Sequence, residues 1–214
     1  MLRSHEPELL DGEGVNDAAL RRAYRELQGV NRFLGNTAAI LRLLRQENAQ
    51  TVLDIGCGQG GLLEEIQERT GASVLGIDMR NAPVDAPVSI VTGNAVTDSL
   101  PRTDVALCVL MAHHLTEEDV ISLVRNVSRS CDRLILLDLV RHRVPLVLFS
   151  IFVAPFLCAI NAADGKTSIR RAFTAREMQA LVDEALSGAE RQVARKRHSV
   201  APFWIRQVVD IHWV

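Results

Sequence analysis

The sequence predicts an α/β protein in which helices cover both faces of a largely parallel sheet. Beyond residue 50, short apolar runs alternate with amphipathic stretches, and a glycine-rich loop follows the first of these runs. Strand, helix and strand in this rhythm require crossover connections between parallel strands. The 214 residues are 48% apolar and 23% charged, which is typical of a globular chain with one main domain and an appendage.

Residues 1–48 precede the first strand and predict an N-terminal helical cap. The first 16 residues have the composition of a loose leader. From Asn16-Asp17 onward, apolar residues recur at spacings of three and four, which predicts a helix that ends at Gly35. A second helix is expected over 37–47. We expect these helices either to pack on the sheet or to cover a site.

Residues 49–214 predict the core, with strands at regular intervals and helices between them. Thr116 and Thr174 have the side chains and the acidic followers expected of helix N-caps. The predicted strands span 51–55, 73–77, 89–92, 105–110, 134–139, 190–198 and 203–209, and the clearest helices span 62–69 and 175–185.

Residues 144–163 form an apolar segment of 20 residues without a charge, interrupted by Pro145 and Pro155. Its length approaches that of a membrane span. A span is disfavoured because the elements on both sides must join one sheet. We expect a buried or lid-like helical hairpin inserted in the core. A dimer interface and peripheral contact with an anionic membrane through flanking arginines are the alternatives.

The central motif is VLDIGCGQGG, whose glycines follow a strand and precede a helix. Such glycines let the chain turn sharply and let a ligand approach backbone amides. Asp78 ends the second strand 18 residues after Gly60, where a carboxylate can hold ribose hydroxyls. Asp54 suits a ligand with a cationic part, such as S-adenosylmethionine. An NAD(P)-dependent oxidoreductase with Arg80 near the ribose is the alternative.

The ordered motifs VLDIGCGQGG, GIDMR, VTGNAV and DVALCVLMAHHL resemble those of class I S-adenosylmethionine-dependent methyltransferases. This resemblance implies a three-layer Rossmann-like methyltransferase fold, with a seven-stranded sheet whose last strand is antiparallel. It places Asp78 on the ribose hydroxyls and Met79 against the adenine. It also implies contacts with the rest of the cofactor from Asp54, Gly56, Cys57, Gly58, Gly60, Asn94, Ala95 and Met111.

One of these assignments departs from the family pattern, and two candidate residues have alternative explanations. Asn94 stands where the family often has Asp, although an amide can still accept a hydrogen bond through its carbonyl. Cys57 also suits a small buried filler. Arg32 is a further candidate for the cofactor carboxylate, but a solvated arginine on a helix surface is the alternative.

Histidine is the expected general base for methyl transfer to a phenolic oxygen. His113 and His114 follow the fourth predicted strand, where parallel sheets bind their ligands, and His142 follows the fifth. A purely structural role for these histidines is the alternative. Only two lysines occur, so amine nucleophiles are scarce. No Cys/His spacing suits zinc, and we expect no metal.

The opening RSHEPELLDG and the later NRFLG are similar to small bacterial methyltransferases associated with type III polyketide synthases. This similarity implies O-methylation of a small hydrophobic acceptor, either phenolic or a polyketide-derived lipid. Quinone-type C-methylation is a looser alternative, and a non-catalytic membrane-associated binding protein is another. The net charge of −2 argues against a nucleic-acid partner. We expect a cytoplasmic protein, and the oligomeric state is open.

Overall fold

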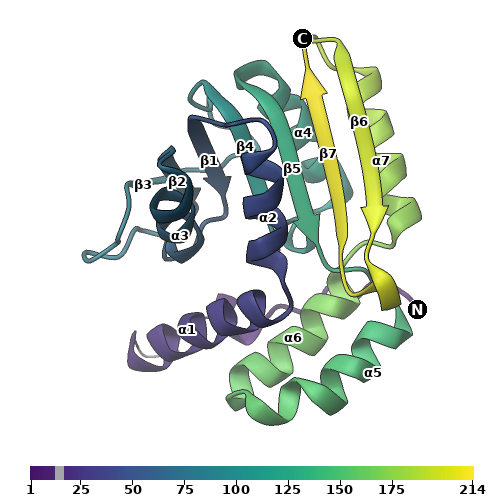
Figure 1. Ribbon diagram of the computed structural model, residues 1–214. Helices are drawn as coiled ribbons and strands as arrows, with labels where there is room; N and C mark the ends of the chain where they lie inside the picture. Colours follow the sequence, from purple (N-terminus) through teal and green to yellow (C-terminus); the bar gives the residue numbers. More distant parts are fainter. Residues whose placement is uncertain (13–16) are drawn as a thin grey trace.

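The computed structural model describes residues 1–12 and 17–214. Its centre is one sheet with the strand order β3-β2-β1-β4-β5-β7-β6 (Figure 1). The strands from β3 to β5 are parallel, and β7 runs antiparallel to both of its neighbours, as predicted. The strands are β1 (Thr51–Ile55), β2 (Ser73–Asp78), β3 (Ile90–Thr92), β4 (Thr103–Val109), β5 (Cys131–Asp138), β6 (Val193–Val200) and β7 (Gln207–Trp213).

Two pairs of helices complete the three predicted layers. Helices α2 (Asn36–Arg45) and α3 (Gly61–Thr70) cover one face, and α4 (Glu117–Ser130) and α7 (Ala175–Ser187) cover the other (Figure 1). Neighbouring strand residues divide between the two cores: Val52 packs toward α2 and α3, whereas Leu53 packs toward α4. Burial on both faces explains why the strands read as continuous apolar runs.

The helix starts follow the capping rules. Thr116 accepts the backbone N–H of Asp119 at the start of α4. Thr174 accepts the N–H of Glu177, and Glu177 caps the Thr174 N–H in return, which forms a capping box before α7. Both predicted N-caps are therefore confirmed.

Three helices lie beyond the carboxyl ends of the parallel strands: α1 (Asp17–Phe33), α5 (Arg143–Phe152) and α6 (Ala159–Arg171) (Figure 1). Helices α5 and α6 form the hairpin expected of the apolar segment. A 3₁₀ turn, η3 (Ala154–Phe156), separates them at Pro155. Among the described helices, none has the length and apolar character needed to cross a membrane.

The structure corrects two sequence predictions. Residues 1–12 are not a loose leader, because both carboxylate oxygens of Asp164 accept backbone N–H groups of Leu9 and Leu10 at 2.7 and 2.9 Å. These two residues lie in the 3₁₀ turn η1 (Leu9–Asp11). Residues 13–16, and with them Asn16 of the predicted helix start, lie outside the described residues. The predicted strand 203–209 begins too early, since η4 (Pro202–Trp204) precedes β7.

Candidate functional site: a glycine loop and a histidine cluster

The glycine loop turns at the carboxyl end of β1 with a backbone that favours glycine. Gly56, Gly58 and Gly60 have φ values of 71°, 57° and 80°, a region that other residues rarely adopt. A Cβ on Gly56 would lie 2.4 Å from Cγ of Met111, so the loop and the end of β4 touch. Gly60 also caps the start of α3, which directs backbone amides toward a ligand position.

Asp78 is fixed against this loop. Its Oδ2 accepts the Gly58 N–H at 2.8 Å, and its Oδ1 accepts the Arg80 N–H at 2.9 Å. The spacing in the sequence predicted that Asp78 lies near the loop. The structure shows a direct hydrogen bond between Asp78 and Gly58 of this loop. Each carboxylate oxygen retains a lone pair for a ligand hydroxyl.

Asp54 is a buried carboxylate, with only 3% of its surface exposed. Burial and the neighbouring Asp78 raise the pKa of Asp54 to about 8. In the described parts of the chain, no hydrogen-bond partner compensates this carboxylate. Such a group suits a cation delivered by a ligand.

Helix α1 covers the glycine loop. The Tyr24 ring packs against Gly58, and the side-chain amide of Gln28 fills the space that a side chain at Gly61 would need. Arg80 donates to Tyr24 Oη at 3.1 Å and to the Leu10 carbonyl at 2.9 Å. The N-terminal region is thus tied to the end of β2 and covers the site, which was one of the two expected arrangements.

The predicted adenine-side residues gather after β2 and β3. Met79 is 74% exposed, so its side chain is open to a ligand. Asn94 Oδ1 accepts the Val96 N–H at 3.0 Å, which leaves one lone pair of this carbonyl for a ligand donor. Ala95 is buried, and its carbonyl accepts from Asn126 at 2.8 Å. The cofactor roles of these residues stay predictions.

Two other predicted cofactor residues, Cys57 and Arg32, make contacts within the protein. Cys57 packs its sulfur against Gly76 of β2, as a filler would, and burial raises the pKa of its thiol. Arg32 forms an ion pair with Glu65 at 2.9 Å on the surface. A contact between either side chain and a cofactor stays a prediction.

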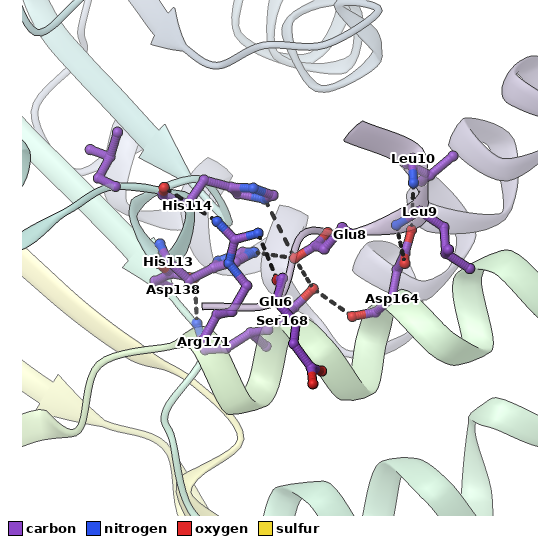
Figure 2. A network of polar contacts seen from close by, with 12 residues as sticks. Glu6, Glu8, Leu9, Leu10, His113, His114, Asp138, Asp164, Ser168 and Arg171 are labelled. Atoms are coloured by element: carbon purple, nitrogen blue, oxygen red, sulfur yellow. Dashed lines mark hydrogen bonds and ion pairs between the residues drawn. The ribbon is translucent and has the colours of Figure 1, made fainter. Parts of the chain in front are cut away.

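His113 and His114 lie in a 3₁₀ turn, η2 (Ala112–His114), directly after Met111. His113 is buried, and its Nδ1 lies 2.7 Å from Asp138 Oδ1 (Figure 2). The other carboxylate oxygen of Asp138 accepts the His113 backbone N–H at 2.7 Å. This double contact fixes both the ring and the turn to the end of β5.

Glu8 reaches the same place from the N-terminal segment (Figure 2). Its Oε1 lies 3.5 Å from His113 Nε2 and 3.7 Å from His114 Nε2, and it accepts Ser168 Oγ–H at 2.8 Å. Burial opposes a charge on His113, but Asp138 and Glu8 outweigh it and raise the pKa of His113 to about 9. The pKa of Glu8 is lowered, because His113 outweighs its burial.

Glu8 and Asp138 were not predicted from the sequence as site residues. Asp138 had a usable signal, because an acid at the carboxyl end of a parallel strand stands where ligands bind. Glu8 had none, since it lies 105 positions before His113 in a segment without periodicity. The third predicted histidine, His142, accepts the Val144 N–H with Nδ1 and stacks on Trp204 at 4.4 Å. A catalytic role for His142 stays a prediction.

The strand order and the glycine loop define a Rossmann-like fold, and Asp78 stands at the carboxyl ends of its parallel strands, where folds of this class bind their ligands. Residues 22–145 match a family model described as a methyltransferase domain. The chain belongs to this family, which confirms the resemblance seen in the ordered motifs.

The curated relatives match only part of the chain. It is 34% identical over 99 residues to a ubiquinone biosynthesis O-methyltransferase of Pseudomonas paraeruginosa, across 40% of each protein. A ubiquinone biosynthesis O-methyltransferase of Pseudomonas fluorescens is 34% identical over 97 residues, across 39% of each protein. The matched stretch therefore spans less than half the length of these relatives.

Solved structures share the fold at low identity. The plantazolicin methyltransferase BpumL, in complex with a monoazolic desmethylPZN analog and SAH, has a TM-score of 0.69 and 15% identity over 92% of this chain and 90% of that chain. Human N-acetylserotonin methyltransferase in complex with SAM has a TM-score of 0.57 and 14% identity over 94% of this chain and 59% of that chain. These similarities confirm the predicted fold.

Proposed function

We propose that this protein transfers a methyl group from S-adenosylmethionine to an oxygen atom of a small hydrophobic acceptor. The observation that supports this cofactor is Asp54, a buried carboxylate beside the glycine loop and Asp78 for which the described residues supply no hydrogen-bond partner. S-adenosylmethionine supplies an activated methyl on a cationic sulfonium and also has an ammonium group. A dinucleotide offers no such cation at its pyrophosphate.

The residues present fit this cofactor. Asp54 would compensate its positive charge, and Asp78, held by two backbone N–H groups, would accept the ribose hydroxyls. The open side chain of Met79 would cover the adenine. Met111, which touches Gly56, would mark the methionine end. These roles follow the family resemblance, and the positions of Asp54, Asp78 and the loop support them.

Methyl transfer is an in-line displacement, so the protein must mainly align donor and acceptor. The turn η2 follows Met111, and this proximity in the chain supports a role for His113 and His114 near the proposed methionine end. His114 has a 29% exposed side chain and is the better placed of the two to meet an acceptor, whereas the side chain of His113 is 4% exposed.

The helical hairpin supports a hydrophobic acceptor. Its outer side exposes Val147, Ile151, Phe152 and Phe156, which suits a lipid-like molecule or the surface that carries one. The curated relatives are named O-methyltransferases, which favours oxygen over the alternative of quinone C-methylation. A phenolic or polyketide-derived lipid and an association with type III polyketide synthases stay proposals from the sequence resemblance.

Calorimetry with S-adenosylmethionine, S-adenosylhomocysteine, NAD and NADP tests the cofactor. We expect binding of the first two only, and binding of a nicotinamide cofactor alone would reject the proposal.

Incubation with S-adenosylmethionine and a panel of alkylphenols and quinones, followed by mass spectrometry, tests the acceptor. Flotation with vesicles of neutral or anionic lipid tests peripheral membrane contact through 144–163.

A further inference from the structure

We propose that Glu8, His113 and His114 form a site for one divalent transition-metal ion. Their three ligand atoms lie within 4.8 Å of one another. Glu8 and His113 are buried, while His114 is partly exposed, so the site has an opening toward solvent. Two imidazoles and one carboxylate are a donor set suited to Zn²⁺ and similar ions.

The distances between the three ligand atoms also suit a shared ion. A charge-assisted N–H···O bond measures about 2.7–2.9 Å, yet Glu8 Oε1 lies 3.5 and 3.7 Å from the two Nε2 atoms. Ligands bound at about 2.0–2.1 Å around a tetrahedral ion are separated by about 3.3–3.4 Å. These two separations lie close to that value, and all three ligand atoms lie within 4.8 Å of one another.

The surroundings of the cluster resemble those of built metal sites. Asp138 holds His113 Nδ1 at 2.7 Å, which directs Nε2 toward Glu8. Metal-binding histidines are commonly oriented by a carboxylate on their other nitrogen in this way. Ser168 donates to Glu8 Oε1 at 2.8 Å and orients the carboxylate. Asp138 therefore orients His113, and Ser168 orients Glu8.

The site would have two consequences. Because Glu8 belongs to the N-terminal segment, the ion would fasten that segment to η2 at the end of β4. A fourth coordination position would lie on the exposed side of His114, three residues from Met111. An acceptor oxygen or a water molecule would occupy that position, where the ion would favour the deprotonated oxygen. This second consequence rests on the proposed methyl transfer, but the metal site does not.

Zn²⁺ binding to the full chain tests the site. The protein is stripped with a chelator, dialysed and titrated with Zn²⁺ in competition with a chromophoric chelator, and Co²⁺ is used to report coordination geometry. We expect one ion per chain and the absorption of tetrahedral Co²⁺. A His5→Ala variant is the matched control, because His5 is an exposed histidine of the same segment. It should bind as the wild type does.

Glu8→Gln and His114→Asn should each weaken Zn²⁺ binding by tenfold or more, and Asp138→Asn by about 10–100-fold. His114→Asn changes a partly exposed side chain and keeps the test valid if a buried variant fails to fold. Wild-type binding well below one ion per chain, or unchanged binding in His114→Asn, would overturn the site. S-adenosylmethionine binding measured on the same samples separates this outcome from failure of the proposed function.

Discussion

The carboxylate of Asp78 accepts the backbone N–H of Gly58 at 2.8 Å, so the end of β2 and the glycine loop form one rigid unit. The same carboxylate is the proposed partner of the cofactor ribose. Asp78 holds the loop through Gly58 and, in the proposed role, would also bind the ribose hydroxyls. A substitution of Asp78 would therefore remove two contacts, one with the Gly58 N–H and one with the cofactor ribose.

Asp78→Ala should weaken S-adenosylmethionine binding by about 1–3 kcal/mol, because the ribose hydroxyls and the Gly58 N–H lose their acceptor. Calorimetry measures the change. Asp85→Ala, at an exposed acid in the loop after β2, is the control and should bind normally. Equal affinities of the Asp78 variant and the wild type would refute the ribose role.

Asp54 predicts a pH-dependent cofactor affinity. In the free protein the pKa of Asp54 is raised to about 8, so this carboxyl is protonated at neutral pH. A bound cation favours the ionised form and lowers the pKa, so binding releases a proton. Affinity should rise about tenfold per pH unit up to about pH 8 and then level off.

Calorimetry in buffers of different ionisation enthalpy would detect that proton. Asp54→Asn cannot release it and should bind more weakly with a flat pH profile over the same range. A wild-type affinity that falls as the pH rises from 6 to 8 would contradict the assignment, since it would require proton uptake.

Gly56→Ala should abolish measurable cofactor binding while the protein stays folded. The change strains a φ of 71° and places a Cβ 2.4 Å from Met111, so the loop or Met111 must move. Gly71→Ala is a matched control, because Gly71 has a φ of 75° but no atom within 4 Å of its Cβ position. It should lose stability and keep affinity. Parallel losses of affinity in both variants would show that backbone strain alone is responsible.

Much of the fold was predictable because its signals are local. Apolar runs of strand length, the glycines between them and the threonine caps depend on neighbours within a few residues. β1 therefore begins and ends where the sequence predicted, at Thr51–Ile55. The start of β7 was predicted too early, because Phe203 and Trp204 are apolar and aromatic like strand residues but lie exposed in the turn η4 with positive φ angles.

The cofactor half of the site was predictable for the same reason, since spacing alone relates Asp78 to the loop. The histidine cluster was only half predictable. The pair His113-His114 is visible in the sequence. Glu8 lies beside this pair only in the folded chain, and no periodic pattern in the sequence predicts that contact. Its position follows from contacts such as those of Asp164 with Leu9 and Leu10, which form only in the folded chain.

Substituting one partner of the buried ion pair Arg133–Asp210 should markedly lower the free energy of unfolding. Arg133 donates to both oxygens of Asp210 at 2.7 and 2.9 Å, and both residues are buried. Arg133→Met removes the bidentate partner of Asp210, which among the described residues keeps only His212 at 3.1 Å and Arg195 at 4.0 Å, and should cost up to about 3–5 kcal/mol. Urea unfolding measures this loss. The double variant Arg133→Met/Asp210→Leu should recover part of it, and a double loss equal to the sum of both single losses would show that the residues act independently.

Glu26 should hold the cap helices together. It lies on α1, and its Oε2 accepts the Cys158 N–H at 2.9 Å and Asn161 Nδ2–H at 3.0 Å at the start of α6. The Cys158 N–H contributes most to lowering the pKa of Glu26 to about 2. A lowered carboxyl pKa means that its stabilising effect is complete above the unfolded pKa near 4.3 and is lost as the pH falls toward 2.

Glu26→Ala should therefore speed amide hydrogen exchange in the first turn of α6 at neutral pH, while exchange in the central strands stays slow. Hydrogen exchange with mass spectrometry resolves the two regions. Glu68→Ala, at an exposed position on α3, should leave both unchanged. If Glu26→Ala exchanged like the wild type in α6, the α1–α6 contact would not hold the cap, and its closure over the glycine loop would depend on Arg80 and Tyr24 instead.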